Sequence, residues 1–245
     1  MRIGSILLLL LLLVNSCQRK AAPIYFQGGP LAIKGQEANP PAIDTLFAPY
    51  RAQLDSAMQI PVGLLGEKME KKGKNGSLGF FIADALLEVA RQQTPDRIDG
   101  CVINAGGIRL PELPAGTIKS GKVYELLPFD NEGVVVTISG KELWVFFQHV
   151  LRSGGWPVSN LSIDYSDSVL LNIHVGGNQV EENKEYKLLM PDYIANGGDR
   201  CSMLNALPRY SLHLLLRDAL IRYLKQKDAA QAAVLHEPKQ RWQSK

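Results

Sequence analysis

The segment from Asn104 to Arg109 has the composition of a ligand-binding loop. It reads Asn-Ala-Gly-Gly-Ile-Arg and directly follows a short apolar run at 101–103. The paired glycines Gly106 and Gly107 let the backbone turn sharply and approach a ligand closely. Asn104 can both donate and accept hydrogen bonds, and the planar guanidinium of Arg109 suits a phosphate group. The alternative is a tight turn after a strand, with a surface arginine.

A second segment, residues 192–199, also follows an apolar run and reads Asp-Tyr-Ile-Ala-Asn-Gly-Gly-Asp. It combines the aromatic ring of Tyr193, a permissive Gly-Gly turn at 197–198 after Asn196, and the carboxylate of Asp199. Such a carboxylate can accept both hydroxyls of a ribose. Alternatively, Asn196 and Asp199 satisfy backbone groups within a local turn.

A third segment, residues 127–131, places Phe129 after a proline in a polar loop, an unusual position for a large apolar side chain. Two aromatic rings on separate loops, here Phe129 and Tyr193, could hold a planar base between them, and stacking contributes about 1–3 kcal/mol per base. The alternative is that Phe129 anchors its loop in the core.

The elements that must position these segments follow from hydrophobic periodicity and turn signals. We expect helices at 41–58, 77–91, 139–151 and 211–224, and strands at 101–103, 134–138, 161–165, 169–175 and 186–190. Helices and strands alternate, with a hairpin-rich section late in the chain. This order predicts a single α/β or α+β domain with a mixed sheet.

The N-terminal residues have the pattern of a secretory signal. Arg2 precedes an apolar run at 6–14, which is too short to span a bilayer, and small residues lead to Cys17. The run before Cys17 resembles the lipobox of bacterial lipoproteins, so we expect a signal peptide at 1–16 and lipidation of Cys17. An ordinary signal peptide cleaved nearby is the alternative. With Cys17 lipidated, the chain would be an exported bacterial lipoprotein, anchored to a membrane at the periplasmic face or the cell surface.

The remaining boundaries follow from composition. We expect a tether at 17–40, a folded domain at 41–226 and a polar, frayed tail at 227–245. With 245 residues, a hydrophobic fraction of 46% and a formal charge of +3, the chain is typical of a globular protein without a nucleic-acid partner. Cys101 and Cys201 lie beside the first two segments, and the sequence leaves open whether they form a disulfide or stay buried free thiols.

Taken together, the three segments resemble the C-terminal, substrate-binding domain of the 5'-nucleotidase family. The resemblance extends over about residues 67–224. It rests on Asn-x-Gly-Gly-Ile-Arg, Leu-Pro-Phe and Tyr-x-Ala-Asn-Gly-Gly-Asp in that order, with lesser matches at 77–79, 83–85 and 157–162. It implies a single layered α/β/β/α-type domain with mixed sheets.

The resemblance also implies a role for each matching residue. Phe129 and Tyr193 would clamp a base, Asp199 would hold the ribose hydroxyls, Arg109 would reach the ribose–phosphate region and Asn104 would bond the nucleoside. The full predicted binding set is Asn104, Gly106, Gly107, Arg109, Phe129, Tyr193, Asn196, Gly197 and Asp199.

Three positions depart from the family pattern. Tyr193 stands where phenylalanine is usual, and Gly79-Phe80 replaces a Gly-Asn pair. An arginine expected upstream of Ser77 is replaced by lysines, which lack its forked geometry. The available lysines are Lys71, Lys72 and Lys74.

No metal centre is expected in this chain. Its four histidines are scattered: His149 and His213 on predicted helices, His174 on a strand and His236 in the tail. Family resemblance implies that two divalent metals belong to a metallophosphatase domain. We therefore expect this chain to be the nucleotide- or nucleoside-binding half of a split 5'-nucleotidase, completed by a separate metallophosphatase polypeptide. The alternatives are a stand-alone nucleoside-binding lipoprotein and a degenerate scaffold.

Overall fold

The computed structural model describes residues 41–229, 234 and 240–245. The predicted signal peptide, the lipidation site Cys17, the tether and His236 lie outside these residues. The chain divides into two units, residues 1–46 and 47–245. Helix α2 (Pro41–Met58) begins in the first unit and ends in the second.

Helix α2 has the bounds predicted from its periodicity, but its apolar side chains are not buried. Phe47, Tyr50 and Leu54 are 48%, 67% and 57% exposed. The helix is amphipathic in sequence, and its apolar face is open to solvent. Across the described part of the chain, none of the helices has the length and apolarity that crossing a bilayer requires.

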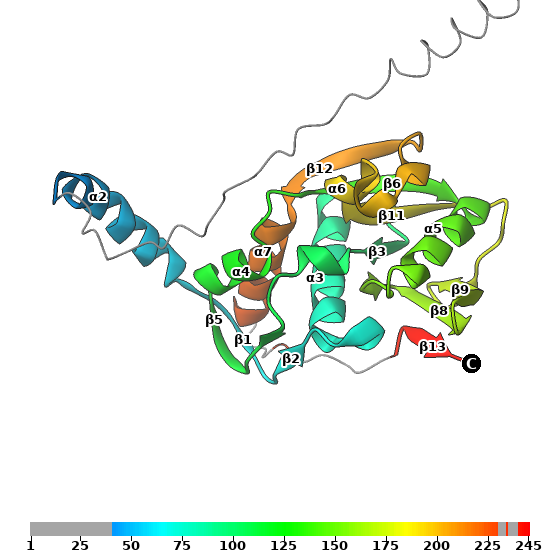
Figure 1. Cartoon of the computed structure of the whole chain (residues 1–245), viewed down its shortest axis with the longest axis horizontal. Coiled ribbons are helices and arrows are strands. Elements are labelled where there is room, and N and C mark those ends of the chain that lie inside the picture. Colours follow the sequence, from blue (N-terminus) through cyan, green and yellow to red (C-terminus); the bar gives the residue numbers. More distant parts are fainter. Residues whose placement is uncertain (1–40, 230–233, 235–239) are drawn as a thin grey trace, which may run out of the picture. The chain divides into compact units, whose positions relative to one another are not determined.

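A five-stranded mixed sheet forms the centre of the second unit (Figure 1). Its strands, in spatial order, are β12 (Arg209–Leu215), β6 (Glu132–Ser139), β11 (Glu185–Pro191), β3 (Gly100–Val102) and β7 (Val158–Ser159). β6 runs antiparallel to β12 and β11, whereas β11 and β3 run parallel. The predicted strands at 101–103, 134–138 and 186–190 are therefore confirmed.

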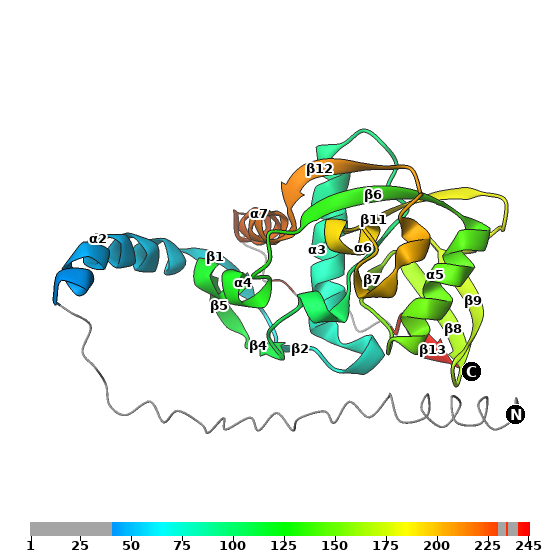
Figure 2. The ribbon, with the colours of Figure 1, turned by 45° about the horizontal axis from the view of Figure 1, so that its top comes forward.

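Both faces of this sheet are covered. Val135 packs into a cluster formed with helices α3 (Ser77–Gln93) and α7 (Leu216–Ala229). Val134 and Val136 pack on the opposite side, against helix α5 (Gly140–Arg152) (Figure 2). Because neither face meets water, the strand is apolar at successive positions and does not alternate with polar residues.

Helix α5 begins where the sequence predicts. Ser139 is its N-cap and accepts a hydrogen bond from the backbone N–H of Glu142 at 3.3 Å. Glu142 reaches back to the backbone N–H of Ser139 at 2.9 Å, which completes a capping box. The Ser139 hydroxyl also donates to the Glu142 carboxylate at 2.7 Å, and this bond, followed by that from the Ser139 backbone N–H, lowers the pKa of Glu142.

The predicted hairpin is confirmed as β8 (Leu161–Ser166) and β9 (Val169–Val175), which pair antiparallel in a second sheet. That sheet continues with β10 (Asn178–Gln179) beside β9 and with β13 (Trp242–Ser244) beside β8. The prediction of a frayed tail is thus wrong for residues 242–244. Trp242 is 1% exposed, and its indole N–H donates to the carbonyl of Trp156 at 2.8 Å.

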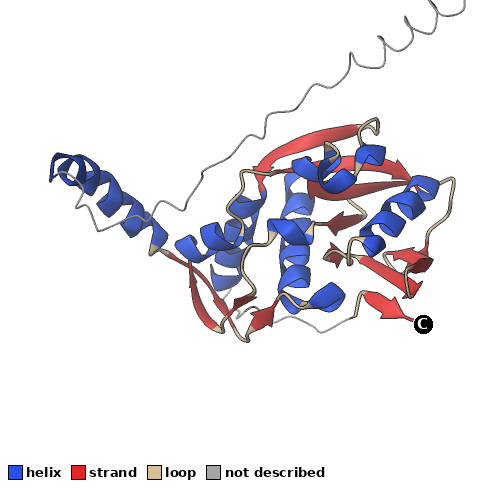
Figure 3. Ribbon diagram, in the orientation of Figure 1, coloured by secondary structure: helices blue, strands red, loops and turns tan. Residues whose placement is uncertain are grey.

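Several short elements had no signal in the sequence (Figure 3). β1 (Pro61–Leu65) pairs with β5 (Gly116–Lys119), and β2 (Met69–Glu70) pairs with β4 (Glu112–Leu113). The short helices are α4 (Ser120–Leu126) and α6 (Asp192–Ala195), with 3-10 turns at Gly73–Asn75, Ala105–Gly107, Gly198–Arg200 and Ser202–Leu204. Elements this short do not complete a recognisable period.

The predicted helix at 211–224 is wrong in its first part. Residues 209–215 form β12, and α7 begins only at Leu216. The leucine-rich run favours a helix, but pairing with the open edge of β6 decides its conformation. His213 therefore lies on a strand, with a φ of +50° at an irregularity in the pairing.

The buried tail generates a stability prediction. Trp242→Ala would lower the free energy of unfolding by about 3–5 kcal/mol, because it removes a fully buried ring and leaves a cavity. Ser244→Ala, on the same strand but exposed, is the matched control and should change it by less than about 0.5 kcal/mol. Urea denaturation of the purified chain measures both. Equal effects of the two substitutions would show that burial of Trp242 does not stabilise the second sheet.

Candidate functional site

The three segments singled out in the sequence meet at one edge of the central sheet. One follows the end of β3, one follows the end of β11, and one precedes the start of β6. Parallel β3 and β11 end at the same edge, and antiparallel β6 begins there. Sheet topology therefore brings together loops that are far apart in the sequence.

These loops enclose a cleft of about 400 Å³. It is lined by Asn104, Gly106, Gly107, Arg109, Phe129, Asn131, Tyr193 and Asp199. Two members of the predicted set, Asn196 and Gly197, are absent from this lining and lie in the turn that carries Asp199. Asn131 was not in the predicted set, although its position two residues after Phe129 was a signal for it.

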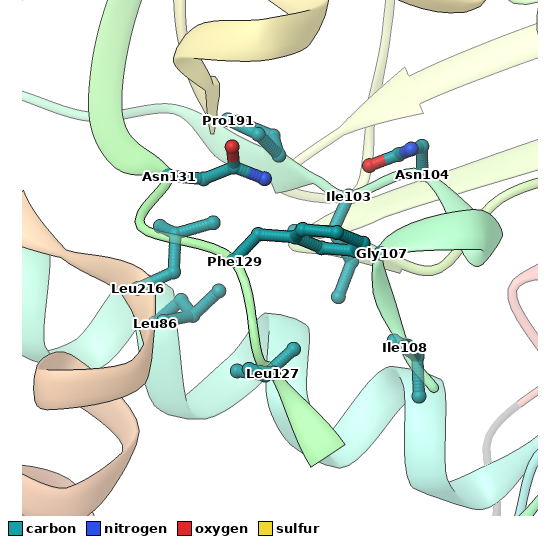
Figure 4. A pocket seen from close by; sticks show the side chains of 10 residues that line it. All are labelled: Leu86, Ile103, Asn104, Gly107, Ile108, Leu127, Phe129, Asn131, Pro191 and Leu216. Carbon is teal, nitrogen blue, oxygen red and sulfur yellow. The ribbon is translucent and has the colours of Figure 1, made fainter. Parts of the chain in front are cut away.

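Phe129 does not anchor its loop by plugging into the core, because its side chain is 48% exposed. One side of the ring borders a small apolar pocket of about 20 Å³ (Figure 4). Leu86, Leu127 and Leu216 line that pocket with it. The ring thus rests on apolar side chains and leaves another part of its surface open to the cleft.

Arg217 braces the loop that carries Phe129. This arginine comes from α7, is 8% exposed, and donates to Asp130 Oδ1 at 2.7 Å and to the carbonyls of Leu127 and Pro128 at 3.5 and 3.4 Å. Its guanidinium also lies over the ring of Tyr124, 4.3 Å from the centroid. A buried charge held by several acceptors fixes the loop from behind.

The carboxylate of Asp199 joins two of the loops. Its Oδ2 accepts a hydrogen bond from the Asn104 amide at 2.8 Å, and its Oδ1 accepts from the Tyr193 hydroxyl at 3.0 Å. Tyr193 is 47% exposed, so its ring, like that of Phe129, presents apolar surface to solvent. The cleft therefore combines two open aromatic rings with one oriented carboxylate.

His149 reaches the site from outside the cleft, and sequence reasoning missed this contact. Its Nε2 lies 2.9 Å from the carbonyl oxygen of Asp199, and because a carbonyl only accepts, Nε2 carries the proton. His149 is on α5, as predicted, and His174 is on β9. No spacing rule connects residues 149 and 199, so the pairing became visible only in the fold.

Lys71, one of the three lysines considered in place of the family's arginine, contacts the loop that carries Arg109. Its Nζ donates to the carbonyl of Ile108 at 2.8 Å, next to Arg109. Burial, and then the positive charge of Arg109, lower the pKa of Lys71. Lys74 instead lies over the ring of Tyr165, 4.9 Å from its centroid. Arg109 itself is exposed and 5.8 Å from the centroid of Phe129.

Cys101 and Cys201 are buried free thiols, which settles the choice that the sequence left open. Burial raises the pKa of the Cys201 thiol to about 11, and burial also raises the pKa of Cys101. Neither is a nucleophile at neutral pH. Within residues 41–229, 234 and 240–245, no three His, Cys, Asp or Glu side chains gather closely enough to hold a metal ion.

Comparison with known families identifies the domain. The family model for the C-terminal domain of 5'-nucleotidases matches residues 58–206, which is more than half of the chain. The chain belongs to this family. The match includes all three loops of the cleft, so the 5'-nucleotidase C-terminal domain is the unit that carries the candidate site.

The individual relatives share about a quarter of their aligned residues with this chain and are longer than it is. Protein UshA of Escherichia coli K12 is 25% identical over 80% of this chain, and the human 5'-nucleotidase is 26% identical over 72%. Each alignment covers only 36% of the relative, so this chain spans about a third of their length. The 5'-nucleotidase precursor of Thermus thermophilus has the same fold, with a TM-score of 0.71 over 83% of this chain and 43% of that one, at 24% identity.

The packing of Tyr193 over its own loop can be tested at Gly198. A Cβ atom there would lie 2.5 Å from the Tyr193 carbonyl oxygen and 2.6 Å from its ring. Gly198→Ala should lower the free energy of unfolding by about 1–3 kcal/mol, because the ring or the turn must shift. Gly106→Ala is the control, since its added methyl would meet only the Asn104 amide at 3.7 Å. Denaturation curves that coincide for the two variants would contradict this packing.

Proposed function

We propose that this domain binds the nucleoside part of a nucleotide in the cleft and presents it for 5'-phosphoester hydrolysis in nucleotide catabolism. The observation that carries the proposal is the pair of half-exposed rings, Phe129 and Tyr193, on two separate loops around one cleft with the Asp199 carboxylate. Globular proteins normally bury such rings, and a planar base between them would cover their open surface. A cleft of about 400 Å³ is within the usual range for small ligands.

Each lining group has a role in this proposal. Phe129 and Tyr193 stack on the base, Asp199 accepts the ribose hydroxyls, and Asn104 and Asn131 offer amide groups to the nucleoside. Arg109 is the group suited to a phosphate oxygen, because its guanidinium is exposed and forked. Membership of the 5'-nucleotidase C-terminal domain family supports these assignments, since the matched residues 58–206 include all three loops.

Hydrolysis needs groups that the cleft does not offer. Among the residues that the structure describes, its lining holds one carboxylate, one guanidinium, two amides and no histidine or cysteine. A two-metal centre requires several oxygen or nitrogen ligands around each ion. In the proposal, divalent metals and their ligands come from a separate metallophosphatase polypeptide, and the assembled enzyme acts outside the cytoplasm. Lipidation of Cys17 would hold this half at a membrane.

Binding is the first test. Calorimetric titration of the purified chain with adenosine and with AMP should give saturable binding. Phe129→Ala and Tyr193→Ala should each weaken it by about tenfold or more, because each removes a stacking partner worth about 1–3 kcal/mol. Val145→Ala, an exposed apolar residue outside the cleft, is the control and should leave the affinity unchanged. Failure of both ligands to bind the wild-type chain would refute the proposed site.

Catalysis is tested separately. Incubated with AMP and Mn²⁺, the purified chain alone should release no phosphate above the buffer control, since the cleft carries no metal-ligand set. Phosphate release by the wild-type chain alone that disappears in Phe129→Ala would show that no separate metallophosphatase polypeptide is needed. AMP binding without phosphate release, even after the soluble extract of the same cells is added, would instead favour a stand-alone nucleoside-binding lipoprotein.

A further inference from the structure

The Tyr193 hydroxyl forms two hydrogen bonds, both to Asp199. It donates to Asp199 Oδ1 at 3.0 Å and accepts from the Asp199 backbone N–H at 3.2 Å. The aromatic ring alone would suffice for stacking, so the hydroxyl has a second use. Its partner, Asp199, is the one carboxylate that lines the cleft in the described part of the chain.

These contacts fix a strained residue. Asp199 has a φ of +49°, and Arg200 after it has a φ of +65°. Non-glycine residues rarely adopt this left-handed conformation, and two in succession persist only when surrounding contacts hold them. The Tyr193 hydroxyl holds the main chain of Asp199 through its N–H, and His149 holds it through its carbonyl.

The same contacts also set the direction of the carboxylate. A carboxylate has about four acceptor positions on its two oxygens. The Asn104 amide takes one on Oδ2 and the Tyr193 hydroxyl takes one on Oδ1. One position on each oxygen remains, which matches the two donors of a vicinal diol.

We propose that the Tyr193 hydroxyl is a positioning group that presets the Asp199 carboxylate for a vicinal diol, and so makes the cleft selective for ribonucleosides over nucleosides that lack both hydroxyls. The inference rests on the proposed nucleoside site. It assigns to the hydroxyl of Tyr193 a role in sugar selection, in addition to the role of its ring in stacking.

The opposite reading of the same contact is that the hydroxyl occupies the place of a sugar hydroxyl and blocks it. Two observations favour positioning. The hydroxyl is tied to the Asp199 N–H as well as to its side chain, so it belongs to the turn. The ring also packs against Gly198, where an added Cβ would come within 2.6 Å of it, so the hydroxyl cannot swing out freely.

The test compares Tyr193→Phe, which keeps the ring and removes the hydroxyl, with the wild-type chain in calorimetric titrations. The ligands are adenosine and 2',3'-dideoxyadenosine, which have the same base and differ in the diol. We expect the substitution to weaken adenosine binding by roughly three- to tenfold, the range of one net hydrogen bond. Dideoxyadenosine binding should change by less than twofold. Tyr50→Phe, at an exposed tyrosine outside the cleft, is the matched control and should affect neither ligand.

The outcomes separate this inference from the proposed function. An equal loss for both ligands would show that the hydroxyl only stabilises the loop, and tighter adenosine binding would show that it blocks the diol; either overturns the inference while the nucleoside site stands. Absence of adenosine binding by the wild-type chain would overturn the site and the inference together. A thermal unfolding curve for each variant checks that it is folded at the temperature of the titrations.

Discussion

The register between β3 and β11 is the constraint on which the cleft depends, and Asp99 sets it. Its backbone N–H donates to the carbonyl of Lys187 at 2.8 Å, and its carboxylate accepts from the Lys187 N–H at 2.8 Å. Asp99 is 7% exposed, and its other carboxylate oxygen contacts Arg97 at 2.5 Å. A one-residue slip usually buries polar residues, but this sheet is apolar on both faces, so that penalty does not fix the register of β3 and β11. The hydrogen bonds between Asp99 and Lys187 fix it instead.

The other end of the same strand pair defines the edge where the loops leave the sheet. Pro191 pairs with Gly133, and a proline, having no N–H, cannot continue the ladder. The chain after β11 therefore leaves the sheet beside the point where β6 begins, which places Tyr193 and Phe129 around one cleft. Arg217 of α7 then holds the Phe129 loop through its hydrogen bonds to Asp130 and the loop carbonyls. The site is thus built on the sheet edge and secured by a helix that covers one face.

The sequence was informative where an element is long or a motif is compact. The helices α2, α3 and α5 and the strands β6, β8, β9 and β11 have clear periods or continuous apolar runs, and the three loop motifs each carry glycines next to polar or aromatic residues. The edge strand β12 was misread because its leucines suit a helix as well as a strand, and only β6 decides between them. Contacts such as His149 with Asp199, or Asn75 with the backbone of Trp242, join residues that no local pattern relates.

Two departures from ordinary packing meet at the cleft, although exposed rings also occur on α2 and a left-handed φ also occurs at His213. Phe129 and Tyr193 are large apolar side chains left half exposed, and Asp199 and Arg200 keep a left-handed backbone without being glycine. Each is unfavourable taken alone, yet Arg217, Asn104 and His149 hold these loops in place from outside the cleft or from its wall. A domain that minimised its own free energy would bury both rings and relax the turn. Exposed rings and a left-handed turn around one cleft are expected where a bound ligand completes the packing.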